Sequence, residues 1–259
     1  MPSPGSVLVV GGSRGLGKAL VDHYIARTSV EVYSTQRSQE HPGGDKNVKW
    51  IHRIDLMKST VGEDIAKQLS GVEISTTFIT AGVFVREEFD KRGPIWEDEV
   101  KMYHTSSIAP PFIVHALVKA KNLIKGAKIV LVSSEAGSIT LRTAGGGDYA
   151  HHGSKAALNM VGKQLSYDLE PLGIAVGIIH PSFMRTEMTK GVGFDVAWDE
   201  NGALHPHEAA EILAKWTDDE LDMSKSGEFW APRGTRDIGS WNDVYGKESQ
   251  KEGPVQLPW

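Results

Sequence analysis

His151 and Lys155 are the residues whose types and spacing first suggest chemistry. They lie in GDYAHHGSKAALNM, residues 147–160, which resembles the opening of a helix. A step of four residues turns a helix by about 400°, so both side chains would project within about 40° of one face. An imidazole with a pKa of about 6.5 suits proton transfer at neutral pH, but the nearby Lys155 cation disfavours the imidazolium. We therefore expect a hydrogen-bonding, orienting His151 and a weak proton donor; the alternative is that it fills space or caps the helix.

A metal site at the adjacent His152 is not expected. Neighbouring helical residues diverge by about 100°. The chain has no cysteine, and no obvious carboxylate cluster joins the two histidines.

A second signal lies near the N-terminus, in VLVVGGSRGLGKAL, residues 7–20. A hydrophobic strand runs directly into a glycine-rich turn, and an amphipathic helix follows. Glycines allow a tight turn and a close approach of the backbone to a pyrophosphate at the helix N-terminus. This context predicts nucleotide binding. The residues assigned to the turn are Gly11, Ser13, Arg14, Gly15, Leu16 and Gly17.

The end of the second strand, in VEVYSTQRS, favours NADP(H) over NAD(H). An acidic residue there would bind the ribose 2′-hydroxyl of NAD, but the chain has Thr35, Gln36 and Arg37. No carboxylate would repel a 2′-phosphate, and the guanidinium of Arg37, with Arg14 as a second contact, could pair with it. The alternative is that Arg37 is a solvated loop charge.

Short β-branched runs that alternate with amphipathic segments would carry these residues. Strands are predicted at 7–10, 30–34, 48–51, 76–80, 128–133 and 174–180, with a seventh at 229–231. Helices are predicted at 17–26, 62–69, 98–120, 151–169 and 206–215. The alternation indicates an α/β, Rossmann-type, doubly wound parallel sheet with helices on both faces. No linker divides the chain, so we expect one domain over 1–259, with a nucleotide-binding part at about 6–140 and a substrate-side segment at about 181–225.

Composition argues against several classes of function. Hydrophobic and charged contents of 40% and 24% are typical of a soluble globular protein. A net charge of -5 gives no reason to expect nucleic acid or an anionic membrane as a partner. The start of the chain lacks the features of a signal peptide, and no apolar run approaches the roughly 20 residues of a membrane helix. With no cysteine in addition, a cytoplasmic protein is expected.

Several motifs in order resemble the short-chain dehydrogenase/reductase family from about residue 6 to the C-terminus. The glycine turn is followed by SSEAGSI at 133–139, SKAALNM at 154–160 and HPSFMRTEM at 180–188. The resemblance is closest to the C-factor-like branch, with its patterns SS-x-x-GSI, YRxSKAALNM and HPxxxRTxM. It implies a serine and a tyrosine that hydrogen-bond a substrate carbonyl, and a lysine that holds the nicotinamide ribose and lowers the tyrosine pKa.

Carried over by position, Ser134 matches the serine and Lys155 matches the lysine. Asp55 matches the residue beside adenine, and Thr186 matches the threonine beside the nicotinamide amide or pyrophosphate. The cofactor contacts that the resemblance implies, besides the glycine turn, are Asp55, Leu56, Ala81, Gly82, Lys155, Pro181 and Thr186.

Three positions depart from the family pattern. ITAG at 79–82 replaces NNAG and puts Thr80 in place of an asparagine, and Ser106 stands where an asparagine keeps a water relay in place. His151 stands at the tyrosine. Tyr149 is the alternative acid, but it is six residues from Lys155, about 600° around a helix and so roughly opposite, unless it precedes the helix.

Loss of the tyrosine with retention of the cofactor residues points toward reduction of a C=N bond or of an unusually activated carbonyl. A ketone needs its developing alkoxide protonated, whereas an iminium accepts hydride and becomes a neutral amine. Reductases of fungal alkaloid pathways resemble this pattern, and some couple iminium reduction to a cyclisation. Three alternatives stay open: ketone/alcohol redox with His151 as acid/base, a non-redox cyclase or isomerase, and a catalytically silent NADP-binding protein.

The expected small-molecule substrate is bulky and apolar. Large side chains gather in the substrate-side segment, although they also suit a plain core: Phe183, Met184, Met188, Phe194 and Trp198. The family resemblance implies a homodimer or homotetramer built through the long helices near 98–120 and 151–169.

Overall fold

The computed structural model describes residues 5–27, 29–39 and 47–259. In these residues one eight-stranded sheet has the order β3-β2-β1-β4-β5-β6-β7-β8. The strands are β1 Ser6–Val10, β2 Glu31–Thr35, β3 Val48–Ile51, β4 Ile74–Ile79, β5 Leu123–Val132, β6 Ala175–Ile179, β7 Glu228–Ala231 and β8 Val255–Gln256. All neighbours pair in parallel except β7 and β8. The predicted doubly wound parallel sheet is confirmed, with one strand more than expected.

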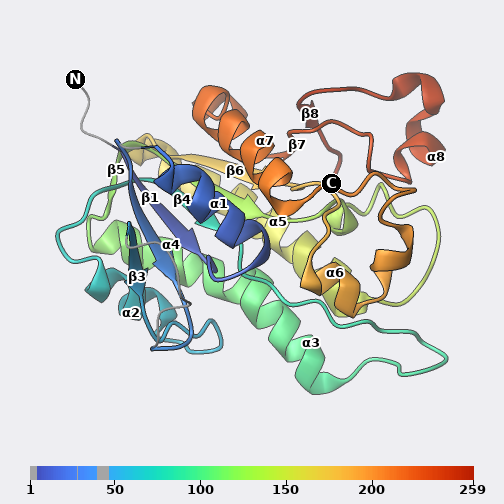
Figure 1. Cartoon of the computed structure of the whole chain (residues 1–259), viewed down its shortest axis with the longest axis horizontal. Helices are drawn as coiled ribbons and strands as arrows, with labels where there is room; N and C mark the ends of the chain where they lie inside the picture. Colours follow the sequence, from blue (N-terminus) through green and yellow to red (C-terminus); the bar gives the residue numbers. More distant parts are fainter. Residues whose placement is uncertain (1–4, 28, 40–46) are drawn as a thin grey trace.

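Helices cover both faces of the sheet, as its apolar strands require. Helices α1 Gly15–Ile25 and α7 Pro206–Asp219 contribute to one core with β1 and β6, and they lie side by side in Figure 1. Helices α2 Val61–Gln68, α4 Ala109–Lys119 and α5 Tyr149–Leu169 contribute to the other core. The strand order reverses between β1 and β4, so a crevice is expected at their carboxyl ends.

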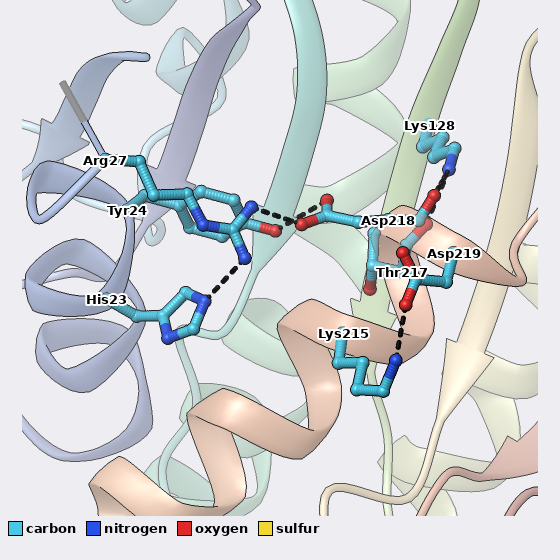
Figure 2. A network of polar contacts seen from close by, with 8 residues as sticks. All are labelled: His23, Tyr24, Arg27, Lys128, Lys215, Thr217, Asp218 and Asp219. Atoms are coloured by element: carbon cyan, nitrogen blue, oxygen red, sulfur yellow. Dashed lines mark hydrogen bonds and ion pairs between the residues drawn. The ribbon is translucent and has the colours of Figure 1, made fainter. Parts of the chain in front are cut away.

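A polar network fixes α7 to α1 and to β5 (Figure 2). The Tyr24 hydroxyl and the Arg27 guanidinium both donate to the Asp218 carboxylate, at 3.0 and 2.5 Å. Lys128, at the middle of β5, donates to the main-chain oxygens of Thr217 and Asp218 at 2.6 and 2.9 Å. The carbonyls at the C-terminal end of α7 thereby gain the partners that a helix end lacks.

The predicted helix over 98–120 is interrupted. It begins earlier as α3, Trp96–Tyr103, widens into a π-helical turn at His104–Ile108, and continues as α4. Pro110 and Pro111 follow this turn and cannot donate to the carbonyls four residues back. A widened turn just before them accommodates that loss.

The C-terminal tail packs on the body of the domain. Val255–Gln256 forms β8 against β7, and the Trp259 ring stacks on Phe229 with centroids 6.0 Å apart. The short helix α8, Trp241–Tyr245, contributes Trp241 to the same small core. Within the described ranges, every helix is too short or too polar to cross a membrane.

Candidate active site

A cavity of about 1310 Å³ opens where the strands end. This exceeds the roughly 300–1,000 Å³ typical of a site for one small ligand. Every residue assigned to catalysis or to the cofactor from the sequence lines it. Those residues are Gly11, Ser13, Arg14, Gly15, Leu16, Gly17, Thr35, Gln36, Arg37, Asp55, Leu56, Ala81, Gly82, Ser134, His151, Lys155, Pro181 and Thr186.

The glycine turn has the shape of a phosphate cradle. Gly11 has φ 96°, and a Cβ there would lie 2.9 Å from Ala81. A Cβ on Gly17 would collide with the Gly11 carbonyl oxygen. Helix α1 begins at Gly15 without a side-chain cap and without an acidic residue in its first turn. Its unpaired N–H groups and the positive end of its dipole face the space that the missing side chains leave, which fits an anion.

Neighbouring polar groups stabilise this turn. The Gly11 N–H donates to the Thr35 hydroxyl at 2.9 Å, and the Thr80 hydroxyl donates to the Val10 carbonyl at 3.0 Å. Thr80 thus ties the end of β4 to β1. Arg14 and Arg37 are both exposed at the rim of the cavity.

Lys155 is buried in α5 with its ammonium group against the end of β5. Its Nζ donates to the Val132 carbonyl at 2.8 Å, and burial lowers its pKa to about 8. Ser134 lies two residues beyond the end of β5, and its Oγ accepts the Ala136 N–H at 3.1 Å. Ser106 lies in the π-helical turn, and its hydroxyl is buried without a hydrogen-bond partner among the described residues.

His151 lies in the first turn of α5 with its ring stacked on Phe84, at 3.9 Å between centroids and 18° between planes. Burial, reinforced by the charge of Lys155 and by His152 and Arg142, lowers its pKa to about 3. The Nδ1 atom is buried and makes no hydrogen bond within the described chain. A neutral imidazole retains a single N–H donor. His151 is therefore a neutral, partly apolar wall of the cavity.

The aromatic surroundings of His151 extend across the cavity. Phe194 lies edge-on to both Phe84 and Phe183, with centroids 5.9 and 6.2 Å apart. The guanidinium of Arg86 covers the Phe194 ring at 5.2 Å. Phe194 belongs to a short 3-10 turn, Phe194–Ala197, that follows helix α6, Glu187–Gly191. Three separate segments thus build one aromatic wall.

Comparison with known proteins decides the family. The family model for short chain dehydrogenases matches residues 6–196, well over half of the chain. The chain belongs to the short-chain dehydrogenase family.

Curated relatives of this short-chain dehydrogenase agree with that assignment. The 1-hydroxy-2-glutathionyl-2-methyl-3-butene dehydrogenase of Rhodococcus is 31% identical over 245 residues, which cover 89% of this chain and 97% of that protein. The C-signal protein of Myxococcus xanthus is 33% identical over 95 residues, covering 36% of this chain and 55% of its own.

Solved structures show the same fold. The carbonyl reductase Sniffer of D. melanogaster has a TM-score of 0.76 and 22% identity, with 98% of this chain and 99% of that chain covered. An NADPH-bound carbonyl reductase from chicken fatty liver has a TM-score of 0.72 and 24% identity, with 87% and 95% covered.

Several residues of this short-chain dehydrogenase's cavity had no signal in the sequence. Phe84 and Arg86 come from the loop after β4, Asp148 precedes α5, and Asp237 follows β7. Their neighbours lie far away along the chain, and no local spacing marks them. Tyr149, the alternative acid, is the first residue of α5; it also lines the cavity and is 42% exposed.

Proposed function

We propose that this chain is an NADPH-dependent reductase that delivers hydride to the C=N bond of a bulky, largely apolar iminium. The observation that carries the proposal is the neutral His151. With a pKa of about 3, its imidazolium is absent at neutral pH, so the position expected to hold the acid has no readily released proton. An iminium needs none, because hydride addition alone yields the neutral amine.

The choice of cofactor rests on the glycine cradle and on the end of β2. The nicotinamide supplies the hydride when it is bound. The N–H groups at the start of α1 would hold the pyrophosphate, and Arg14 and Arg37 would pair with a 2′-phosphate. Lys155 would donate to the nicotinamide ribose. The chicken liver relative in fold was solved with NADPH bound, which supports the same choice.

The walls of the cavity suit a flat, largely apolar substrate. Phe84, Phe183 and Phe194 line one side and exclude water. The single N–H of neutral His151 and the hydroxyl of Ser134 can orient polar atoms beside the reacting carbon. The volume leaves room for a bulky ligand beside a dinucleotide.

Reduction of a ketone is the second candidate, with Tyr149 as the acid. Tyr149 lines the same cavity, and two relatives in fold are carbonyl reductases. In that case His151 only lines the cavity, and the phenol of Tyr149 supplies the proton.

The test uses 4S-deuterated NADPH, a mixed panel of cyclic imines and ketones, and mass spectrometry of the products. We expect deuterium in amines, with a rate that largely survives in both His151→Phe and Tyr149→Phe. Deuterium in alcohols would contradict the proposal. A loss of about 10²–10⁴-fold in one variant would then identify the acid.

Two further outcomes separate the remaining functions. A cyclised, labelled amine would add a ring-closing step to the proposal. Tight NADPH binding without label in any product of a broad panel would favour a non-redox or a silent protein.

A further inference from the structure

The chain leaves β6 through a strained turn at Ser182. This residue has φ 80°, in the left-handed region that favours glycine, and is 6% exposed. A residue with a Cβ stays in this region only where its surroundings hold it there. Ser182 lies between Pro181 and Phe183, and all three line the cavity.

The group that holds this turn comes from a loop 54 residues further along the chain. The Phe183 N–H donates to Oδ2 of Asp237, which lies in the loop after β7, at 2.5 Å. The Asp237 side chain is only 1% exposed. The same oxygen lies 3.6 Å from Nε2 of His180 and 3.7 Å from Nη1 of Arg233. One carboxylate therefore contacts His180, before Ser182 in the chain, and Phe183, after it.

The surroundings keep this carboxylate charged and oriented. Burial alone raises the pKa of Asp237, but the contacts with His180, the Phe183 N–H and Arg233 outweigh it and hold the pKa below its usual range. His180 is oriented in turn, because its Nδ1 accepts the Glu135 N–H at 3.0 Å. Hydrogen bonds to a charged acceptor are stronger than neutral ones.

The direction of the turn decides where the following segment runs. Thr186 is the N-cap residue of α6, and its Oγ1 accepts the Thr189 N–H at 3.2 Å. The Thr186 methyl group lies 3.9 Å from the point where a Cβ on Gly15 would stand, so the segment reaches the glycine turn. On the way it places Phe183 against the aromatic wall.

We propose that Asp237 is a positioning residue: its carboxylate holds Ser182 in the left-handed conformation, so that residues 183–189 lie over the cofactor half of the cavity. The inference rests on the proposed function in one respect, that the cavity binds NADPH. Asp237 itself acts on the turn and not on the reacting atoms.

The test combines Asp237→Ala and Asp237→Asn with two changes at Ser182. We expect Asp237→Ala to speed amide hydrogen exchange in residues 182–186 about tenfold or more, since a hydrogen bond to a charged group is lost. We expect a similar rise in the dissociation constant for NADPH, measured by its fluorescence. Asp237→Asn, which keeps the shape, should give a smaller change in both.

Ser182→Gly distinguishes positioning from general damage. Glycine adopts φ 80° without strain, so Ser182→Gly in the Asp237→Ala background should restore most of the NADPH affinity and of the slow exchange at Arg185 and Thr186, whose own acceptors remain. The Phe183 N–H stays without its acceptor and should exchange fast in both. Ser182→Ala keeps the Cβ and should restore neither the affinity nor the slow exchange. Asp243→Asn, an exposed carboxylate further along the same segment, is the matched control and should match the wild type.

Two results would overturn the inference. One is unchanged exchange in residues 182–186 in Asp237→Ala; the other is equal recovery of the NADPH affinity with glycine and alanine at 182. If Asp237→Ala does not fold, the comparison is made in Asp237→Asn. If the wild type does not bind NADPH, the proposed function fails, and the exchange data alone still decide the role of Asp237.

Discussion

His151 is neutral in the folded chain, whereas the imidazole of the unfolded chain has a pKa of about 6.5. With the folded pKa lowered to about 3, the unfolded chain takes up a proton below pH 6.5 that the folded chain does not. Acidification from about pH 6.5 toward pH 3 therefore lowers the free energy of unfolding, by up to about 1.4 kcal/mol per pH unit from this group. His151→Phe should remove that contribution. Its stability relative to the wild type should rise as the pH falls, as measured by urea unfolding between pH 7 and 4.5.

The control for this prediction is His115→Phe, the same chemical change at an exposed position of α4. Carboxylates titrate in all three proteins, so their contributions to the pH dependence of stability cancel in the comparison. Parallel stability curves for His151→Phe and the wild type would show that His151 is protonated equally in both states. The neutral imidazole, and with it the argument for an iminium substrate, would then be wrong.

For single residues, the sequence could predict the positions that depend on spacing within one helix or one turn. His151 and Lys155, one helical step apart, and the glycines at 11, 15 and 17 all line one cavity, as their spacing predicted. Neither the stacking partner of His151 nor its buried Nδ1 follows from spacing, because Phe84 is 67 residues away and burial is a property of the whole fold. The sequence predicted only that Lys155 disfavours the imidazolium, whereas burial is the larger cause.

Among the elements, α5 depends on a cap from a distant loop. Its own N-cap residue, Asp148, makes no side-chain cap. Instead Oε2 of Glu87, from the loop after β4, accepts the Ala150 N–H at 2.9 Å. Reciprocal bonds lock the pair, since the Glu87 N–H donates to Asp148 Oδ1 and the Asp148 N–H donates to the Glu87 carbonyl, both at 2.9 Å. The first turn of α5 carries His151, so Glu87 fixes the wall of the cavity.

Glu87→Ala should fray that first turn. Loss of a helix cap costs about 0.5–2 kcal/mol, and we expect a lower free energy of unfolding in urea. Hydrogen exchange should quicken in residues 149–152 and stay slow in residues 158–166. Glu87→Gln can still accept from Ala150 and should lose less. Glu88→Gln, an exposed neighbour paired with Lys91, is the control. A uniform increase in exchange over the whole of α5 would contradict a local capping role.

The elements themselves were largely predictable, because apolar runs and amphipathic periods are local patterns. Two differences have identifiable physical causes, one local and one tertiary. The prolines at 110 and 111 turn one expected helix into two with a π-helical turn between them. The two-residue strand β8 has no periodicity to detect and forms only because β7 offers an unpaired edge.

For the whole molecule, the network of Figure 2 links the two ends of the fold. Asp218, near the end of α7, accepts from Tyr24 and Arg27 of the first helix segment, 194 and 191 residues away. Tyr24 is 2% exposed, and burial raises its pKa, so its hydroxyl stays a protonated donor. Removing the acceptor leaves that hydroxyl buried and unpaired, which costs more free energy than removing both partners of the hydrogen bond.

Asp218→Ala should therefore lower the free energy of unfolding by about 1–3 kcal/mol, as measured by urea denaturation. Tyr24→Phe in the same background should recover part of the loss, because no polar group then remains unpaired; the two changes together should cost less than their sum. Lys215→Ala breaks the exposed pair with Asp219 on the same helix and should leave stability unchanged. Strict additivity would mean that the hydrogen bond between Tyr24 and Asp218 contributes no free energy of its own. In that case this contact is a consequence of the packing of α7 on α1 and does not stabilise it.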